Sequence, residues 1–463
     1  MDIAGELKAL VGDHRVSDDP EDLVRHSRDM SSSALISKRA GTTERGAACV
    51  VRPREVAQVQ ALLRWADETG TCVVPYGGGS GVCEGIRPID AVVIDTRAMC
   101  EILDFDDKSR LVRVEAGILG PDLQKALASW GYMHGHEPQS IQISTVGGWV
   151  ATRACGQLSV RYGGIEDVVA GLEAVLPGGG SVRSAATPRS STGPDVARLM
   201  IGSEGALGVV TEATLRVHPI PLERAHACIR FEHMSDGVAA SRRIVQSDLV
   251  PTMMRLYDRD DATLLLMRVP DAEPTPLMLL TFDGSHASDR ARRAAAIAGG
   301  DPGDPALVEH WWEHRNDAVD DFQNVMAGDG VLGPHALVDT LEVSATWARL
   351  RDLYHSTKTA LERETDFVGC HLSHAYTDGA CLYFTMAAAC ESDDDARARH
   401  ARWWVTGMDA CLAAGGSISH HHGIGRLKAP WIERELGGWW HVLRAVKDAV
   451  DPKGIMNPGV LGL

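Results

Sequence analysis

The pattern of hydrophobic and polar positions predicts a mixture of helices and short strands. Residues 54–69 repeat apolar side chains at helical spacing, and these share one face: Val56, Val59, Leu62, Leu63 and Ala66. Gly70 follows as a stop signal for this helix. The short apolar runs 72–75 and 91–95 predict strands.

Further along the chain, turn and helix signals continue the same mixed pattern. Pro121 is placed to open a helix over 121–130. Residues 171–184 predict a hairpin with Pro-Gly-Gly-Gly as its turn, and residues 393–416 predict a helix ended by paired glycines. The expected fold class is therefore α+β.

Length and charge exclude several classes of function. The chain has 463 residues, 46 Lys plus Arg and 63 Asp plus Glu, which gives a net charge of −17. Two or three domains are expected at this length. An acidic chain without a basic stripe is not expected to bind nucleic acid or an anionic membrane surface.

The ten cysteines contain no Cys-x-x-Cys pair, and most stand among apolar residues. This usage favours buried, reduced thiols over a disulfide framework. The chain has no apolar run of 18 residues and no apolar stretch near its start. We therefore expect a cytoplasmic protein with no membrane span.

Three glycine-rich loops, 77–81, 144–148 and 202–208, stand out in the first half of the chain. Such loops expose consecutive backbone N–H groups that can wrap a pyrophosphate. They match neither the nicotinamide pattern G-x-G-x-x-G nor the P-loop pattern. Tight turns alone are the alternative, which three separate loops disfavour.

These loops carry a family resemblance. The segments PYGGGSGV, STVGGWVATRACG and GSEGALGVVTEATLRVHP, in this order, resemble the FAD domain of the vanillyl-alcohol-oxidase/p-cresol-methylhydroxylase (PCMH) family. Within it the chain looks most like the alkylglycerone-phosphate synthases, through GHEPQSIQISTVGGWVATRA, YGGIEDVV, GACLYF and SISHHHGIGRLKAPWIERE. The resemblance runs from about residue 45 to the C-terminus.

The resemblance implies an architecture. It predicts a two-lobed PCMH-type FAD-binding domain over 1–220 and a substrate (cap) domain over 221–425, with an antiparallel sheet and flanking helices. A C-terminal segment, 426–463, is expected to return to the FAD domain. The active site is expected to lie between the domains, facing the flavin, and a homodimer is expected.

The resemblance also implies one non-covalently held FAD. The residues expected to bind it are Pro75, Tyr76, Gly77, Gly78, Gly79, Ser80 and Gly81 at the pyrophosphate, Pro138, Ser144, Thr145, Gly147 and Gly148 by the flavin, and Glu204, Gly208 and Val210 on the adenine and ribose side.

Three histidines are candidate catalytic residues. His421 and His422 belong to a run of three imidazoles, and the resemblance places this run at the flavin and substrate, with His422 the best single candidate for a base. Surface polarity and metal binding are the alternatives. His136 matches a histidine of the synthase site, and its alternative is a polar loop residue.

Tyr383 and Arg255 complete the candidates. Tyr383 matches the synthases' catalytic tyrosine, although a tyrosine in an apolar strand is usually part of the core. A phenol acts as a base only if positive neighbours lower its pKa, and nearby histidines were the expected source. Arg255 is expected either to stabilise reduced flavin or to pair with Asp258.

The chain departs from the synthases at one position. Gly328 stands where they carry an arginine that engages the anionic substrate, and an arginine placed there was expected to be a buried charge. Either another residue, such as His371 or His374, replaces it, or the substrate lacks the anion. The segment HLSHAYTDGA does not reproduce the H-x-G-D-G-N metal motif of neighbouring dehydrogenases, so no metal is expected.

Two functions follow from the resemblance. The first is an FAD-dependent oxidoreductase that moves a hydride from a small hydroxyl- or amine-bearing substrate to flavin N5, with O₂ or an electron carrier as acceptor. The second is a non-redox transferase of the synthase type, which works through a flavin N5 adduct. The missing arginine favours the oxidoreductase, and a non-enzymatic scaffold is disfavoured by the matching titratable residues.

Overall fold

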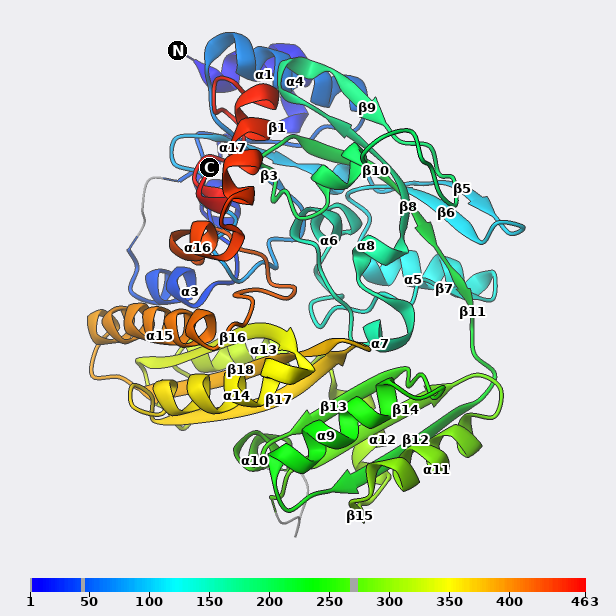
Figure 1. Ribbon diagram of the computed structural model, residues 1–463. Helices are drawn as coiled ribbons and strands as arrows, with labels where there is room; N and C mark the ends of the chain where they lie inside the picture. The colour runs from blue at the N-terminus through cyan, green and yellow to red at the C-terminus, as the bar shows by residue number, and fades with distance from the viewer. Residues whose placement is uncertain (1, 43–45, 267–273) are drawn as a thin grey trace. The chain divides into compact units, whose positions relative to one another are not determined.

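The computed structural model describes residues 2–42, 46–266 and 274–463, and its mixture of helices and sheets confirms the α+β class (Figure 1). The chain divides into two compact units. Unit 1 comprises Met1–Ala154, Gly164–Pro219 and His421–Leu463, and unit 2 comprises Cys155–Gly163 and Ile220–His420. Among the described residues, no helix combines the length and apolarity that a membrane crossing requires.

Unit 1 contains a small, mainly parallel sheet. Its strand order is β1-β2-β4-β3, from β1 (Val16–Ser17), β2 (Cys49–Val51), β3 (Val73–Tyr76) and β4 (Val92–Asp95). Helix α4 (Val56–Thr69) connects β2 to β3. It buries the face predicted from its periodicity, and Gly70 ends it in a left-handed conformation with φ of 69°.

The second lobe of unit 1 is a five-stranded antiparallel sheet of order β5-β6-β10-β8-β9. Its strands are β5 (Ile102–Asp106), β6 (Leu111–Glu115), β8 (Val169–Val175), β9 (Ser181–Arg183) and β10 (Val209–Arg216). The β8–β9 pair is the predicted hairpin. A separate ribbon joins β7 (Tyr132–Met133) to β11 (His218–Pro219).

The remaining helices of unit 1 are short. They are α1 (Ile3–Val11), α2 (Pro20–His26), α3 (Ser32–Arg39), α5 (Gly120–Ser129), α6 (Val146–Thr152), α8 (Ile165–Val168), α16 (Ile432–Leu436) and α17 (Trp439–Val450). Pro121 lies in the first turn of α5, as expected. After α17 the chain returns to the parallel sheet, where the N–H of Val73 donates to the carbonyl oxygen of Ile455 at 2.8 Å.

Unit 2 is built on a seven-stranded antiparallel sheet of order β15-β12-β14-β13-β17-β18-β16. Its strands are β12 (Arg224–Arg230), β13 (Met253–Tyr257), β14 (Leu277–Asp283), β15 (Asp301–Pro302), β16 (Ala336–Thr346), β17 (Phe367–Ala375) and β18 (Gly379–Ala389). Its helices are α7 (Ser159–Tyr162), α9 (Met234–Val245), α10 (Arg259–Leu266), α11 (Ala287–Ala298), α12 (Ala306–His314), α13 (Ala318–Met326), α14 (Trp347–Leu361) and α15 (Asp393–Ala413).

The two faces of this sheet differ in chemistry because side chains alternate along each strand. On one face, Leu256 of β13 lies against Gly237 of α9, and Phe384 of β18 meets Tyr354 of α14. On the other face, Arg255 of β13 lies against Trp311 of α12. The sheet therefore has an apolar face that forms the core and a polar face that can carry chemistry.

Candidate functional site

The predicted pyrophosphate loop of unit 1 is packed against the second glycine segment. A Cβ on Gly78 would overlap the carbonyl oxygen of Ile143, and a Cβ on Gly77 would overlap the hydroxyl of Thr145. Only glycine permits this approach of two backbones. The arrangement leaves a loop of exposed backbone N–H groups without side chains, which fits the diphosphate of FAD.

The residues predicted by the flavin make internal hydrogen bonds. Ser144 accepts from the indole N–H of Trp149 at 2.7 Å, and Thr145 accepts from the N–H of Gly148 at 3.2 Å as the N-cap of α6. Gly147 allows α6 to approach Ala116, which a Cβ would meet at 2.8 Å. These side chains shape the segment. Much of its backbone is bonded within the protein as well, since the N–H of Gly147 donates to the carbonyl oxygen of Ala116 at 2.7 Å.

Glu204 links the third glycine loop to the C-terminal segment. It is buried with φ of 49°, and its carboxylate accepts from the N–H of Ile424 at 2.7 Å and of Gly425 at 2.8 Å. Burial raises the pKa of this carboxyl to about 7. Glu204 therefore fixes the chain that directly follows the histidine run. In the same loop, a Cβ on Gly208 would crowd the carbonyl oxygen of Val175. Two other residues predicted to bind FAD, Pro138 and Val210, are buried.

His136 is fully buried in unit 1. Its ring lies 5.0 Å from that of Trp149, and neither ring nitrogen has a hydrogen-bond partner among the described residues. Burial lowers its pKa to about 3, so the imidazole is neutral near pH 7. A nitrogen of the neutral ring can accept a hydrogen bond, but the ring carries no positive charge at neutral pH.

The histidine run is split between the two units. His420 ends unit 2, while His421 and His422 begin the last part of unit 1. The rings of His421 and His422 meet edge to face at 4.6 Å. The side chain of His420 contacts Tyr376, whose hydroxyl lies 3.0 Å from its Nε2.

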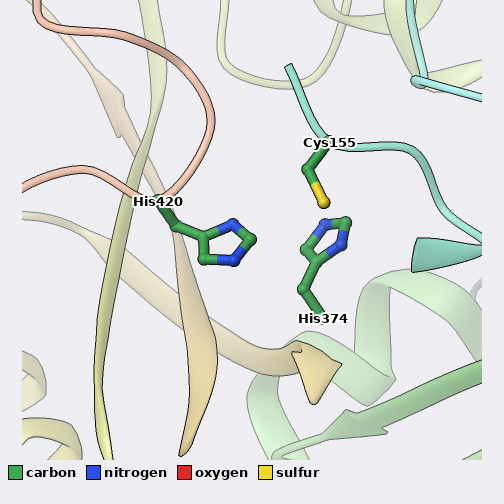
Figure 2. Close-up of side chains that lie close together, drawn as sticks. All are labelled: Cys155, His374 and His420. Carbon is green, nitrogen blue, oxygen red and sulfur yellow. The ribbon is translucent and has the colours of Figure 1, made fainter. Parts of the chain in front are cut away.

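A second cluster in unit 2 contains Cys155, His374 and His420, and each offers a ligand atom within 4.8 Å of the others (Figure 2). His374 has φ of 50° at a bulge in β17, and its Nδ1 lies 2.7 Å from the hydroxyl of Ser159. One sulfur and two imidazoles are donors of the kind that Zn²⁺ uses. The sequence missed this cluster because Cys155 lies more than 200 residues from its partners, and the absence of a metal stays a prediction.

A row of aromatic and polar side chains crosses the polar face of the unit 2 sheet. Strand register places Tyr257 opposite His371, His371 opposite Tyr383, and Tyr383 opposite Glu342. The His371 ring stacks on the Tyr383 ring at 4.8 Å and lies 5.4 Å from that of Tyr257. The structure thus brings Tyr383 together with a histidine that the sequence named only as a possible substitute for the missing arginine.

His371 is paired with a carboxylate. Its Nδ1 lies 2.8 Å from Oδ2 of Asp261, a buried residue of α10. Gly369 makes this possible, because a Cβ there would meet Asp261 at 2.8 Å. Burial, with the nearby charge of Arg255, lowers the pKa of His371, so the ring is neutral and donates from Nδ1. Its Nε2 is left as an acceptor with no partner among the described residues.

Tyr383 is a hydroxyl donor in this arrangement. Its hydroxyl donates to Thr340 at 3.1 Å. Burial raises its pKa, so the expectation that neighbouring histidines lower it is wrong. The physical reason is that His371 is itself neutral and supplies no positive charge.

Arg255 does not pair with Asp258, so that alternative is also wrong. Asp258 is bound by Lys358 at 2.5 Å and by the hydroxyl of Tyr354 at 2.9 Å. Arg255 donates to the hydroxyl of Tyr257 at 3.3 Å, and its guanidinium lies 5.1 Å from the Trp311 ring centre. Within the described residues it makes no ion pair, so its charge remains available to an anion.

Gly328 follows α13 at a turn. Its φ is 97°, its N–H donates to the carbonyl oxygen of Val325 at 3.0 Å, and a Cβ would lie 3.0 Å from the carbonyl oxygen of Pro334. The residue is half-buried, and the burial of an arginine placed here stays a prediction. The left-handed turn explains the glycine without reference to a ligand.

Comparison with known proteins agrees with the fold. The model of the FAD linked oxidases, C-terminal domain, matches residues 220–461, and that of the FAD binding domain matches residues 47–185. The chain is 31% identical to alkyldihydroxyacetonephosphate synthase of Dictyostelium discoideum, over 98% of this chain and 79% of the relative. It is 30% identical to the FAD-linked oxidoreductase YgcU of Escherichia coli K12 (99% and 98%) and to D-lactate dehydrogenase of Anaerostipes hadrus (89% and 88%).

Solved structures give the same result. An alkyldihydroxyacetonephosphate synthase structure matches with a TM-score of 0.79 and 27% identity, covering 98% of this chain and 84% of that one. The structure of p-cresol methylhydroxylase, at 14% identity and a TM-score of 0.77, shares the fold over 99% of this chain and 96% of its own. The glycine loops, the seven-stranded antiparallel sheet and these similarities together show that the chain belongs to the FAD-linked oxidase family and uses FAD.

Proposed function

We propose that the protein is an FAD-dependent oxidoreductase that oxidises a small substrate at a carbon bearing a hydroxyl or amine group. The observation that supports this most is the Asp261–His371 pair, which leaves Nε2 of His371 as an unpaired acceptor on the polar face of the unit 2 sheet. FAD, when bound, takes up the hydride that leaves the substrate carbon. O₂ or an electron carrier would be the final electron acceptor.

His371 is the proposed general base. It takes the proton of the substrate hydroxyl or amine at Nε2 as the C–H bond gives up its hydride, and a carbonyl or imine is the product. Asp261 holds Nδ1–H in place, which fixes the tautomer and stabilises the imidazolium that forms. The sequence predicts this role for His422, which stays an alternative base.

Arg255 and Tyr383 are the proposed substrate-orienting groups. Arg255 has no carboxylate partner within the described residues, and a guanidinium pairs well with a carboxylate or phosphate. The protonated hydroxyl of Tyr383 donates to Thr340 in this structure, and it would exchange that bond for one to a substrate oxygen. An anionic hydroxy compound therefore suits this face, and the name of the D-lactate dehydrogenase relative points to the same class.

An anaerobic screen of hydroxy acids and amines tests the proposal. A true substrate should bleach the bound flavin completely and yield the carbonyl product in equal amount. His371→Asn should slow this bleaching by roughly 10²-fold. His355→Asn, a histidine on the exposed side of α14, is the matched control and should bleach at the wild-type rate. Equal rates in the two variants would remove His371 from the mechanism.

A transferase of the alkyldihydroxyacetonephosphate synthase type is the second candidate. The 31% identity over 98% of the chain supports it, as does Tyr383 in the shared segment GACLYF. Acylated dihydroxyacetone phosphate and a fatty alcohol, incubated with the protein, distinguish the two. Formation of the ether product without net oxidation supports the transferase, and its absence supports the oxidoreductase.

A further inference from the structure

A short N-terminal segment, residues 26–30, runs along the pyrophosphate loop of unit 1. The N–H of Met30 donates to the carbonyl oxygen of Gly81 at 2.8 Å, and Asp29 accepts from the N–H of Gly85 at 2.9 Å. At the other end of the segment, the ring of His26 lies 4.6 Å from that of Tyr76. Because of these contacts, the segment lies directly against the loop.

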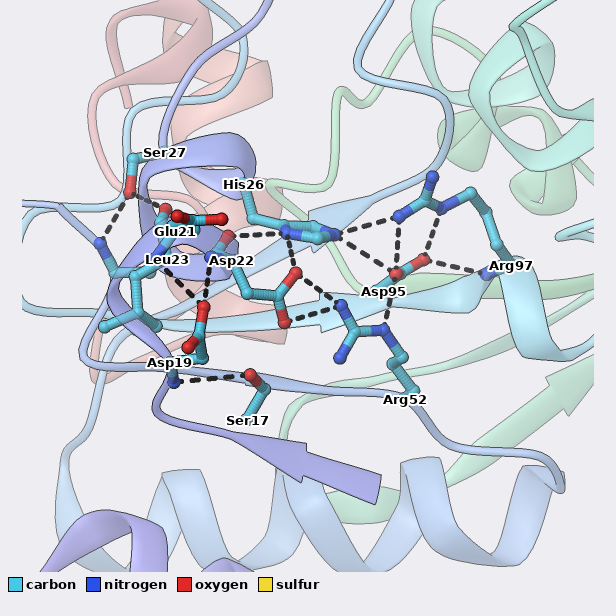
Figure 3. A network of polar contacts seen from close by, with 11 residues as sticks. Ser17, Asp19, Glu21, Asp22, Leu23, His26, Ser27, Arg52, Asp95 and Arg97 are labelled. Carbon is cyan, nitrogen blue, oxygen red and sulfur yellow. Dashed lines mark hydrogen bonds and ion pairs between the residues drawn. The ribbon is translucent and has the colours of Figure 1, made fainter. Parts of the chain in front are cut away.

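Two neighbouring arginines of this region are fully neutralised (Figure 3). Arg97 donates to both oxygens of Asp95 at 2.9 and 2.8 Å. Arg52 donates to both oxygens of Asp22 at 2.8 and 2.7 Å. Their charges are therefore committed to the protein and are not available to a ligand.

Arg28 differs from both. It is half-buried, and within the described residues it makes no hydrogen bond or ion pair. Burial lowers its pKa, and the only group that offsets this is the side chain of Tyr76. A guanidinium that has lost water without gaining a carboxylate is unfavourable unless a ligand supplies the anion.

The contacts of Asp29 and Met30 place the backbone of Arg28 near the glycines. A Cβ on Gly79 would overlap the hydroxyl of Tyr76, so this hydroxyl lies directly against the loop. Arg28 lies between His26, which packs on this tyrosine, and Met30, which donates to Gly81, so its backbone runs along the predicted site of the diphosphate.

The acidic groups around the loop add a need for positive charge. Asp29 is buried, and burial together with Glu84 raises its pKa to about 6. A diphosphate brought next to these carboxyl groups would be repelled unless a cation offset them. Arg87 and Arg426 lie beside these carboxyl groups, and Arg28 would add a further positive charge for the diphosphate.

We propose that Arg28 is a phosphate-binding residue for FAD, whose guanidinium pairs with a diphosphate oxygen while the glycine loop supplies backbone N–H groups. The proposal rests on FAD binding, which the family establishes, and not on the reaction proposed above. It assigns a ligand-binding role to a residue outside the three glycine loops.

FAD binding to the apoprotein tests this directly. Apoprotein is produced in a riboflavin-starved auxotroph, so that no flavin has to be removed, and FAD, ADP and adenosine are titrated by calorimetry. The variants are Arg28→Gln, Arg28→Lys and Arg28→Met, which keeps the apolar stem without the charge. Arg64→Gln, an exposed arginine of α4, is the matched control. Thermal unfolding of each apoprotein checks that it is folded.

We expect Arg28→Gln and Arg28→Met to weaken FAD and ADP binding by roughly 10- to 100-fold, because a charged hydrogen bond is lost. Arg28→Lys keeps the charge and should weaken binding less. Adenosine binding and the control should stay within about twofold of wild type, the spread expected of a surface change. FAD affinity in Arg28→Gln within twofold of wild type would overturn the proposal. Wild-type affinity in Arg28→Met would overturn it too, because an uncharged side chain would then be sufficient.

Discussion

At the scale of single residues, the protonation state of each side chain at neutral pH determines what chemistry the polar face of the unit 2 sheet can carry out. His371 is held neutral by burial, and Tyr383 is held protonated. Arg255 is the charged group of this set. Such a combination offers one base, one hydroxyl donor and one anion-binding group, which is what oxidation of an anionic hydroxy compound requires.

The activity should depend on pH through His371. A base works only when neutral, and burial lowers the pKa of His371 below its usual 6.5. Turnover should therefore be constant as pH falls to 6.5 and decline only below it. A pH profile of kcat/KM measures this, with Asp261→Asn for comparison. That variant should cut kcat by roughly 10²-fold, because the amide no longer selects the tautomer. A decline that begins well above pH 6.5 would point to a different base.

Tyr383→Phe should separate donation from base catalysis. The raised pKa keeps the phenol protonated, so no basic limb from Tyr383 should appear below about pH 10. Loss of its hydroxyl should lower turnover by roughly 10-fold or more and leave FAD content unchanged. His422→Ala, assayed in parallel, tests the alternative base. Turnover near wild type in both variants would return these residues to a structural role.

At the scale of elements, periodicity predicted what lies within one segment and missed what joins distant ones. The helix α4, its Gly70 cap and the β8–β9 hairpin depend on local spacing, and all three were predicted. The Asp261–His371 pair joins residues 110 positions apart through strand pairing, for which the sequence holds no local signal. Segment 26–30 was missed for the same reason, because its role comes from lying beside residues 76–85.

The approach of the first two glycine loops makes a specific prediction for Gly78→Ala. The added Cβ would overlap the carbonyl oxygen of Ile143, and backbone cannot give way as a flexible side chain does. We expect stability to fall by about 1–3 kcal/mol and FAD occupancy to fall at least tenfold. Gly180→Ala is the control, since its Cβ meets nothing within 4 Å and its φ is −71°. Flavin absorbance per protein and thermal unfolding measure both effects, and normal occupancy in Gly78→Ala would argue against this loop as the diphosphate site.

The contact between Glu204 and residues 424–425 predicts a pH-dependent stability. Its pKa is raised to about 7, against about 4.5 in the unfolded chain, so the folded state binds this proton more tightly. Its favourable contribution is present below pH 4.5 and is lost as pH rises through 7. Glu204→Gln should therefore gain stability relative to wild type by about 3 kcal/mol between pH 5 and pH 8. Denaturant unfolding at the two pH values measures the difference, and a constant difference would contradict the raised pKa.

At the scale of the whole molecule, a family resemblance predicted the fold and the cofactor, while the reaction depends on a few substitutions. The fold is shared with an alkyldihydroxyacetonephosphate synthase and with p-cresol methylhydroxylase, whose names denote different chemistry. Gly328 illustrates the difficulty, because a glycine that seemed to report a lost substrate contact also satisfies a turn with φ of 97°. His371 is the opposite case, because its role as a base could be inferred only once the structure placed Asp261 beside it.

The mode of FAD attachment gives the last prediction. A diphosphate held by backbone N–H groups and by Arg28 is bound reversibly, so one FAD per chain should be released into solution when the protein is denatured with acid. Because FAD binds the folded state, adding it back to apoprotein at 100 times Kd should stabilise the fold by about 2.7 kcal/mol and raise the unfolding temperature. Riboflavin at the same concentration should stabilise less, since it lacks the diphosphate. Flavin that stays on the denatured chain would show a covalent bond, and an apoprotein that neither turns yellow nor gains stability with FAD would contradict this site altogether.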